Sequence, residues 1–227
     1  GADSERLAVL VDQLAALPPE GRATLFARLA DLIARFAQEQ RTQLWRAMRA
    51  EAAKNREFKT AVWALPDDDL RHLDDLADAY RPPGATDQYR FLFDEAFPSL
   101  PGVDRSEGYG QYEAAIRQAR AEAAGKIAAA HDWRPIYEFA RSIESVWLLG
   151  AALAEVGVTQ YEPQMLELLE SDHRRDVDFA ASYFGSRFHK EGWPWLKSVV
   201  ASDLSARQQA RLLLATRDFP AAWQHLD

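Results

Sequence analysis

The sequence predicts an all-α fold, and three observations carry this prediction. Apolar residues recur at spacings of three and four along most of the 227-residue chain, which is typical of amphipathic helices. Pro, Gly, Ser and Asp divide these periodic segments into lengths typical of globular helices. No run of β-branched and aromatic residues alternates with polar ones, as a strand would require. We therefore expect helical hairpins, stacked as an irregular α-solenoid or packed as a compact helical domain, with no sheet.

Three helices are expected in the first sixty residues. Ser4 is placed to cap the first, and Pro19 suits the first turn of the second. Thr42 is the expected cap of the third. Their apolar stripes are Leu7, Leu10, Val11 and Leu14, then Leu25, Phe26, Leu29, Leu32, Ile33 and Phe36, and then Leu44, Trp45 and Met48.

Acidic residues and proline mark the next helix. It begins at Pro66 with Asp67, Asp68 and Asp69, whose carboxylates complement the N-terminal end of the helix dipole. Pro82-Pro83-Gly84 ends it, and a shorter helix over 89–93 follows. Residues 97–110 lack periodicity and contain two prolines and three glycines, which indicates a loop or linker.

The second half of the chain consists of closely spaced helical segments. An Ala-rich helix over 112–130 precedes one capped by Asp132, and VWLLGAALAEVG then ends at Gly157, a suitable C-cap. Within that apolar segment we expect Trp147 to be buried, so that Trp147→Ala costs about 3–5 kcal/mol of stability. Further helices are expected at Glu162–Leu169, Asp172–Phe188, Trp195–Val200, Ala206–Leu214 and Ala221–Leu226.

These elements suggest two subdomains and a connection. We expect an N-terminal helical subdomain over 1–96, a loop or linker over 97–111, and a helical-repeat-like subdomain over 112–227. Helical hairpins in the last subdomain would follow one another at roughly 30-residue intervals, within the range of helical repeats.

The segment Val146–Ala154 and the stretch RQQARLLLATRDFPAAW (Arg207–Trp223) resemble helices of HEAT- and tetratricopeptide-like solenoids. The resemblance covers the last 115 residues or so, and it extends to helical repeat regions of large multidomain bacterial proteins. The tetratricopeptide signature of Trp, Leu-Gly and Tyr at fixed offsets is absent, so an irregular helical domain stays an equal alternative. Such a resemblance implies a scaffold that binds another protein.

Composition excludes several classes of protein. With no Cys there is no disulfide framework, thiolate zinc site or cysteine nucleophile. The net charge of -8 disfavours a chain that simply coats nucleic acid. No apolar run approaches a membrane span and no signal peptide is evident, so we expect a cytoplasmic protein. The chain begins at Gly1, which favours a piece of a longer protein.

Charge is unevenly distributed along the chain. Residues 61–107 hold 11 acidic and 4 basic side chains, whereas residues 41–59 are mainly basic. The simpler interpretation is a pair of solvated helix faces that attract each other. The alternative is that the basic segment 41–59 contacts nucleic acid.

The sequence offers no catalytic or metal-binding motif. None of the five His residues has a His partner at the helical spacing that metal sites use. His72 and His173 each have Asp residues at such spacings, for which a surface hydrogen bond is the simpler account. There is no Gly-x-Ser-x-Gly elbow, Walker A motif or Gly-x-Gly-x-x-Gly. We predict no catalytic residue, no metal and no cofactor.

The segment Ser182–Lys197, SYFGSRFHKEGWPWLK, interleaves aromatic and basic residues. Such a mixture can bind a peptide or stack on bases, but the spacing of Phe184 and Phe188 also fits a buried stripe. The candidate binding residues are Arg174, Arg175, Arg187, His189, Trp193 and Trp195.

Three functional hypotheses follow. The first is a non-enzymatic helical scaffold or protein-interaction module of a larger bacterial protein, whose partner is a protein or another domain of the same polypeptide. The second is a helical enzyme or ligand-binding domain with a site near His173, Arg174, Asp176 and His189. The third, which the net charge disfavours, is nucleic-acid contact through residues 41–59.

Overall fold

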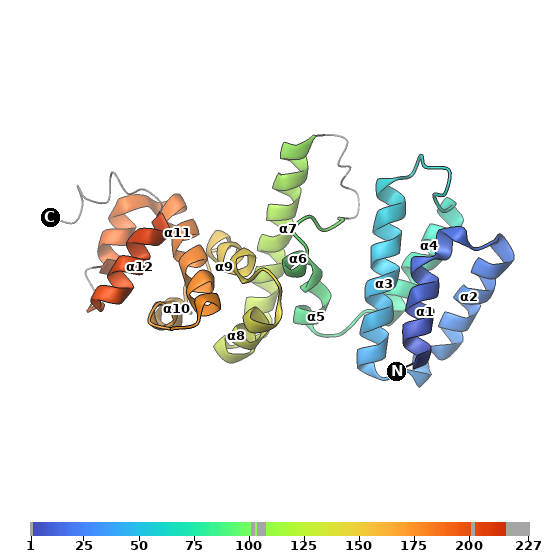
Figure 1. Cartoon of the computed structure of the whole chain (residues 1–227), viewed down its shortest axis with the longest axis horizontal. Coiled ribbons are helices and arrows are strands. Elements are labelled where there is room, and N and C mark those ends of the chain that lie inside the picture. Colours follow the sequence, from blue (N-terminus) through green and yellow to red (C-terminus); the bar gives the residue numbers. More distant parts are fainter. Residues whose placement is uncertain (1, 101–102, 104–107, 201–202, 217–227) are drawn as a thin grey trace. The chain divides into compact units, whose positions relative to one another are not determined.

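The fold is all-α, as predicted. The computed structural model describes residues 2–100, 103, 108–200 and 203–216, and over these residues it contains α- and 3-10 helices and no strand (Figure 1). The α-helices are α1 (Ala2–Asp12), α2 (Pro19–Leu32), α3 (Gln38–Glu57), α4 (Asp67–Tyr80), α5 (Ala85–Tyr89), α6 (Phe91–Asp94), α7 (Tyr109–Ala130), α8 (Trp133–Ser142), α9 (Val146–Glu155), α10 (Glu162–Leu168), α11 (Arg174–Val200) and α12 (Ala206–Thr216). Short 3-10 helices, Leu14–Ala16 and Ile33–Arg35, follow α1 and α2.

Two expected elements fall partly or wholly outside these residues. The helix predicted at Ala221–Leu226 lies outside the described part of the chain, as do residues 101–102 and 104–107 of the predicted linker. Among the helices within the described part, none combines the length and hydropathy needed to cross a membrane.

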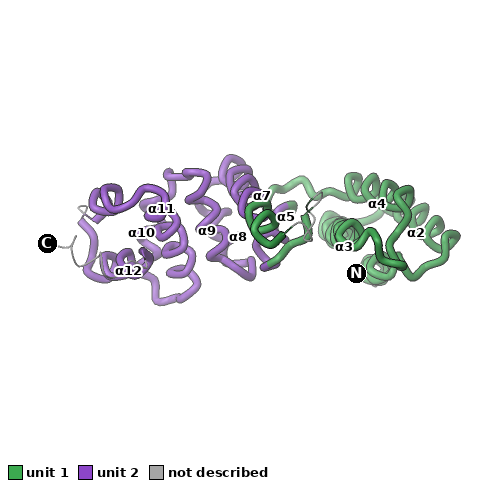
Figure 2. Tube along the Cα trace, turned by 90° about the horizontal axis from the view of Figure 1, so that it is seen from above, with its two compact units in different colours: residues 1–88, 97–115 green, residues 89–96, 116–227 purple. Residues whose placement is uncertain are grey.

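The chain divides into two compact units whose boundary crosses the sequence more than once (Figure 2). Unit 1 contains residues 1–88 and 97–115, and unit 2 contains residues 89–96 and 116–227. The sequence predicts independent domains at 1–96 and 112–227 with a linker between them, and this stays a prediction.

Unit 1 is built on α3, which packs against both α1 and α4, while α2 packs against α4. Its core is mainly aliphatic, with Val11, Leu29, Leu44 and Leu73 fully buried. The buried hydroxyl of Tyr80 donates a hydrogen bond to the Leu29 carbonyl (2.6 Å), and burial raises the pKa of Tyr80 to about 12.

A buried polar cluster fixes the end of α3 to the start of α4. Asn55 Nδ2 donates to the carbonyl and to the carboxylate of Glu51 (2.9 and 2.8 Å), and Asn55 Oδ1 accepts from the backbone N–H of Leu65 (2.8 Å). Both Asn55 and Glu51 are buried. The turn that connects α3 to α4 is therefore tied to the core at its far end.

Unit 2 is organised around α11, which packs against α9, α10 and α12, with α8 contacting both α9 and α11. Gly150 lets the backbone of α9 lie close to the backbone of α11. A Cβ at this position would lie well inside van der Waals contact of the Phe179 carbonyl oxygen and Ser182 Oγ of α11. The main neighbour of α9 is therefore α11, and not the helix that follows α9 in the sequence.

The segment 89–96 completes unit 2. The fully buried Phe93 of α6 meets Phe139 of α8 edge to face, with ring centroids 6.0 Å apart. The Phe93 carbonyl accepts from the backbone N–H of Ser145 (3.0 Å), and Arg120 Nε of α7 donates to the Leu92 carbonyl (2.7 Å).

None of the three expected N-terminal capping side chains acts as predicted, and Ser4 lies inside α1. Thr42 lies inside α3 and its hydroxyl donates to the Gln38 carbonyl, so the helix begins four residues before the expected cap. Asp132 occupies the N-cap position of α8, but its side chain makes no capping hydrogen bond. The break expected between Phe188 and Trp195 is observed at Gly192, where φ is 72° and ψ is −165°, a conformation that strongly favours glycine.

The prediction that Trp147 is buried is wrong. Trp147 is 55% exposed, whereas its neighbours Val146, Leu148 and Leu149 are buried. The helix is present, but its apolar run is nearly continuous, so the pattern alone does not reveal which face is solvated.

We now expect Trp147→Ala to lower the free energy of unfolding by less than about 1 kcal/mol, because the change leaves no core cavity. Leu149→Ala on the same helix is the matched control, and it should cost at least about 2 kcal/mol, since Leu149 is fully buried. Chemical denaturation of both variants measures the difference. Equal losses would mean that α9 is rotated from the orientation described.

Candidate functional site

The predicted aromatic and basic segment lies in α11, and its largest side chains are packed within unit 2. Tyr183 and Phe184 are each 1% exposed. The Tyr183 hydroxyl donates to the Val158 carbonyl (2.8 Å) and to Glu162 Oε1 (3.1 Å). Burial, followed by the negative charge of Glu162, raises the pKa of Tyr183. These contacts are structural, so this half of the segment offers no ligand surface.

Arg187 is a buried cation with two carboxylate partners. Its Nη2 lies 2.8 Å from Glu191 and 3.4 Å from Glu162. Its guanidinium carbon is 5.3 Å from the ring centroid of Trp195, which stacks on Phe184 at 6.3 Å. Arg187 and Trp195 thus pack against each other and against α11 itself.

The other candidate residues are scattered along α11. Trp193 meets Phe188 edge to face (4.9 Å), and His189 is exposed. Arg174 forms an exposed ion pair with Asp178 (3.4 Å), while Arg175 Nε donates to the Ala140 carbonyl (3.3 Å). Twelve residues separate Arg175 from Arg187, which is about 18 Å of helix. The structure therefore does not bring the six residues together in one site.

The alternative site near His173, Asp176 and His189 is also divided. Asp176 is buried and accepts hydrogen bonds from the Tyr137 hydroxyl (3.0 Å) and from Ser171 Oγ (2.8 Å). Burial raises the pKa of Tyr137, and so do its hydrogen bond to Asp176 and the negative charge of Asp176. His189 lies thirteen residues further along α11, about 20 Å away. Within the described ranges, no three His, Cys, Asp or Glu side chains are grouped to hold a metal ion.

The basic segment 41–59 mostly contacts acceptors inside unit 1. Arg56 pairs with Asp74 of α4, and Arg46 pairs with Asp87 (3.3 Å). Arg49 donates to the Ser99 carbonyl (3.5 Å), and Lys54 Nζ lies 3.1 Å from Glu51. The acidic stretch 61–107 therefore supplies several of the partners of the basic helix. This agrees with the interpretation that the two charged segments attract each other.

An exposed apolar cluster lies in the turn between α3 and α4. We call Phe58, Val62 and Trp63 the turn cluster; their exposed fractions are 49%, 106% and 43%. The rings of Phe58 and Trp63 are 5.8 Å apart, and Lys54 Nζ lies 5.3 Å from the Trp63 ring centroid. Sequence reasoning missed this cluster. The available signal was three large apolar residues in a segment without helical periodicity.

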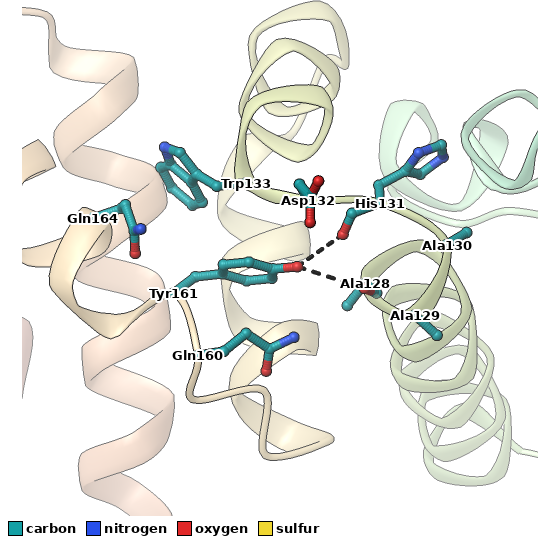
Figure 3. A pocket seen from close by; sticks show the side chains of 9 residues that line it. All are labelled: Ala128, Ala129, Ala130, His131, Asp132, Trp133, Gln160, Tyr161 and Gln164. Atoms are coloured by element: carbon teal, nitrogen blue, oxygen red, sulfur yellow. Dashed lines mark hydrogen bonds between the residues drawn. The ribbon is translucent and has the colours of Figure 1, made fainter.

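An open pocket of about 600 Å³ lies in unit 2 at the C-terminal end of α7 (Figure 3). The Tyr161 hydroxyl donates to the His131 carbonyl (2.8 Å) and more weakly to the Ala128 carbonyl (3.5 Å), which ties the end of α7 to the segment before α10. The lining residues are Ala128, Ala129, Ala130, His131, Asp132, Trp133, Gln160, Tyr161 and Gln164. Sequence reasoning missed this pocket as well, because its two walls are about thirty residues apart in the chain.

Comparison with known proteins adds no family to this description. No family model matches the chain, and no curated protein or solved structure is significantly similar to it. The class that the structure defines is an all-α protein of packed helices.

Proposed function

We propose that this protein is a non-enzymatic helical interaction module, and that the turn cluster of unit 1 is its contact surface for a protein partner. The observation that carries the proposal is the exposure of Phe58, Val62 and Trp63 in one turn, with the rings of Phe58 and Trp63 5.8 Å apart. Contiguous exposed apolar residues mark interaction sites on soluble proteins, and Trp is enriched among the residues that dominate binding energy.

The turn is held in place before any partner arrives. Its backbone contains hydrogen bonds from Ala61 N–H to the Phe58 carbonyl (2.8 Å) and from Ala64 N–H to the Ala61 carbonyl (3.0 Å). The backbone N–H of Leu65 donates a hydrogen bond to the buried side chain of Asn55. A preformed surface loses less conformational entropy on binding, which favours affinity.

The charge around the turn cluster indicates the chemistry of the partner. The ammonium group of Lys54 lies beside the Trp63 ring, and Lys59 is exposed within the same turn. We expect a protein partner with an apolar anchor surrounded by acidic side chains, because such a surface complements both features.

The experiment has two stages. The photoreactive residue p-benzoylphenylalanine is placed at Val62, and at the exposed Ala27 of α2 as a control, in cells that naturally make the protein. We expect a discrete protein adduct from position 62 that is absent from position 27. Identical adducts from both positions would contradict the proposal.

The captured protein is then purified and its Kd measured against the whole chain. Trp63→Ser should raise the Kd at least tenfold, as expected for a central aromatic anchor, and Lys59→Glu should also weaken binding. Val9→Ser, which changes an exposed apolar residue elsewhere in unit 1, should leave the Kd unchanged. An unaltered Kd for Trp63→Ser would overturn the assignment of the surface.

A further inference from the structure

The pocket at the end of α7 is bordered by the negative end of a long helix. α7 has 22 residues and ends at Ala130, so the peptide dipoles place partial negative charge at Ala128, Ala129 and Ala130. No backbone N–H of residues 131–134, all within the described part, donates to these last carbonyls. The Tyr161 hydroxyl is the donor observed there, and it donates to the Ala128 and His131 carbonyls.

Two side chains add acceptors on separate walls of the pocket. Asp132 is exposed, and its carboxylate is not used in capping α8. Figure 3 shows the Asp132 side chain among the residues that line the pocket. On the wall formed by α10, Gln164 Oε1 is buried and has no hydrogen-bond partner. A buried acceptor without a partner is uncommon in a folded protein and calls for a donor.

The remaining wall is aromatic. Trp133 stacks on Phe179 (6.2 Å) and on Tyr137 (5.8 Å), and it lies 5.8 Å from the tilted ring of Tyr161. Because the Tyr161 hydroxyl donates its proton to the His131 carbonyl, its oxygen still has acceptor capacity. None of the nine lining residues is Lys or Arg.

We propose that this pocket binds the cationic head of an organic ligand, an alkylguanidinium or alkylammonium group. The Asp132 carboxylate supplies the opposite charge, and the carbonyls at the end of α7 and Gln164 Oε1 accept the N–H groups. The edges of Trp133 and Tyr161 pack against the attached methylene groups. A guanidinium suits this arrangement because it presents several donors in one plane and needs acceptors from more than one direction.

The same cationic group has two sources, a small free amine and a basic side chain of a protein. N-acetyl-L-arginine methylamide represents the side chain of a protein, and agmatine represents the free amine. N-acetyl-L-citrulline methylamide is the matched control, because it keeps the shape of arginine and lacks the charge. The pocket lies within unit 2, so Trp63→Ser in unit 1 should leave binding of these probes unchanged. The outcome is therefore independent of the proposed function.

The test is a titration of the whole ¹⁵N-labelled chain followed by NMR. The cationic probes should shift the side-chain signals of Gln164 and Trp133 saturably, whereas the citrulline probe should not. Tighter binding of agmatine would assign the pocket to a free amine, and tighter binding of the arginine amide would assign it to a protein side chain. Equal shifts with the citrulline probe would overturn the proposal.

Three variants distinguish binding in the pocket from attraction to the acidic chain as a whole. Asp132→Asn should raise the Kd about fivefold or more, as expected for loss of a charged hydrogen-bond acceptor. Asp75→Asn removes the same charge from the exposed face of α4 and should not change the Kd. Gln164→Leu removes the buried acceptor and should weaken binding while the net charge is kept. Equal effects of Asp132→Asn and Asp75→Asn would mean unspecific attraction, which contradicts the proposal.

Discussion

Gly150→Ala is expected to lower the free energy of unfolding by about 3 kcal/mol or more. The added methyl group would overlap the backbone carbonyl of Phe179, which cannot move aside as a flexible side chain does. It would also overlap Ser182 Oγ, so α9 and α11 would have to separate along the main helix contact of unit 2. Chemical denaturation measures the loss. Hydrogen exchange of the amides in α9 and α11 shows whether it is located there.

Gly125→Ala is the matched control in the same unit. A Cβ at Gly125 of α7 would meet only Val156 Cγ1, at an ordinary contact distance of 3.9 Å. Alanine also has the higher helix propensity, so this variant should be neutral or up to about 1 kcal/mol more stable. A loss below about 1 kcal/mol for Gly150→Ala would mean that α9 and α11 are further apart than described.

Asn55→Leu is expected to cost about 3–5 kcal/mol, because a volume-conserving change removes three buried hydrogen bonds at once. The Leu65 N–H would lose its acceptor. Of the two Glu51 carboxylate oxygens, Oε1 would lose its Asn55 donor, while Oε2 would keep its contact with Lys54. Thermal and chemical denaturation measure the loss in unit 1. A cost below about 1 kcal/mol would contradict the buried polar cluster.

A second substitution tests the cause of that loss. Much of the expected cost is the burial of a Glu51 carboxylate with fewer donors. The double variant Asn55→Leu/Glu51→Leu removes this charge, so it should be more stable than Asn55→Leu alone. If the double variant is the less stable of the two, the charge of Glu51 is not the source of the loss. The main cause would then be the Leu65 N–H, which is left without an acceptor.

The helices of this protein were largely predictable because their signals are local. Proline residues before α2 and α4 and the acidic first turn of α4 mark helix starts that the structure confirms. The periodic stripe of Leu25, Phe26, Leu29 and Leu32 is buried as expected. These features depend on neighbouring residues alone, so no knowledge of the tertiary fold is required.

Helix orientation and site geometry were less accessible. In α9 nearly every residue is apolar, so the sequence did not indicate that Trp147 would be exposed. In α11 the mixture of aromatic and basic residues suggested a ligand surface, yet Arg187 is buried between two carboxylates. The pocket joins the end of α7 to the segment around Tyr161, and such long-range pairing leaves no periodic trace in a single sequence.

The interleaving of the two units has a consequence for synthesis on the ribosome. Leu92 and Phe93 are made before residues 97–115, which complete unit 1, but their partners in unit 2 follow later still. At typical elongation rates, the roughly fifty residues between Phe93 and Ser145 take about 3–10 s to make. During that interval Leu92 and Phe93 lack the later residues that bury them in unit 2. The packing of α6 into unit 2 therefore has to follow the synthesis of α7 and α8, although unit 1 can gather its own residues earlier.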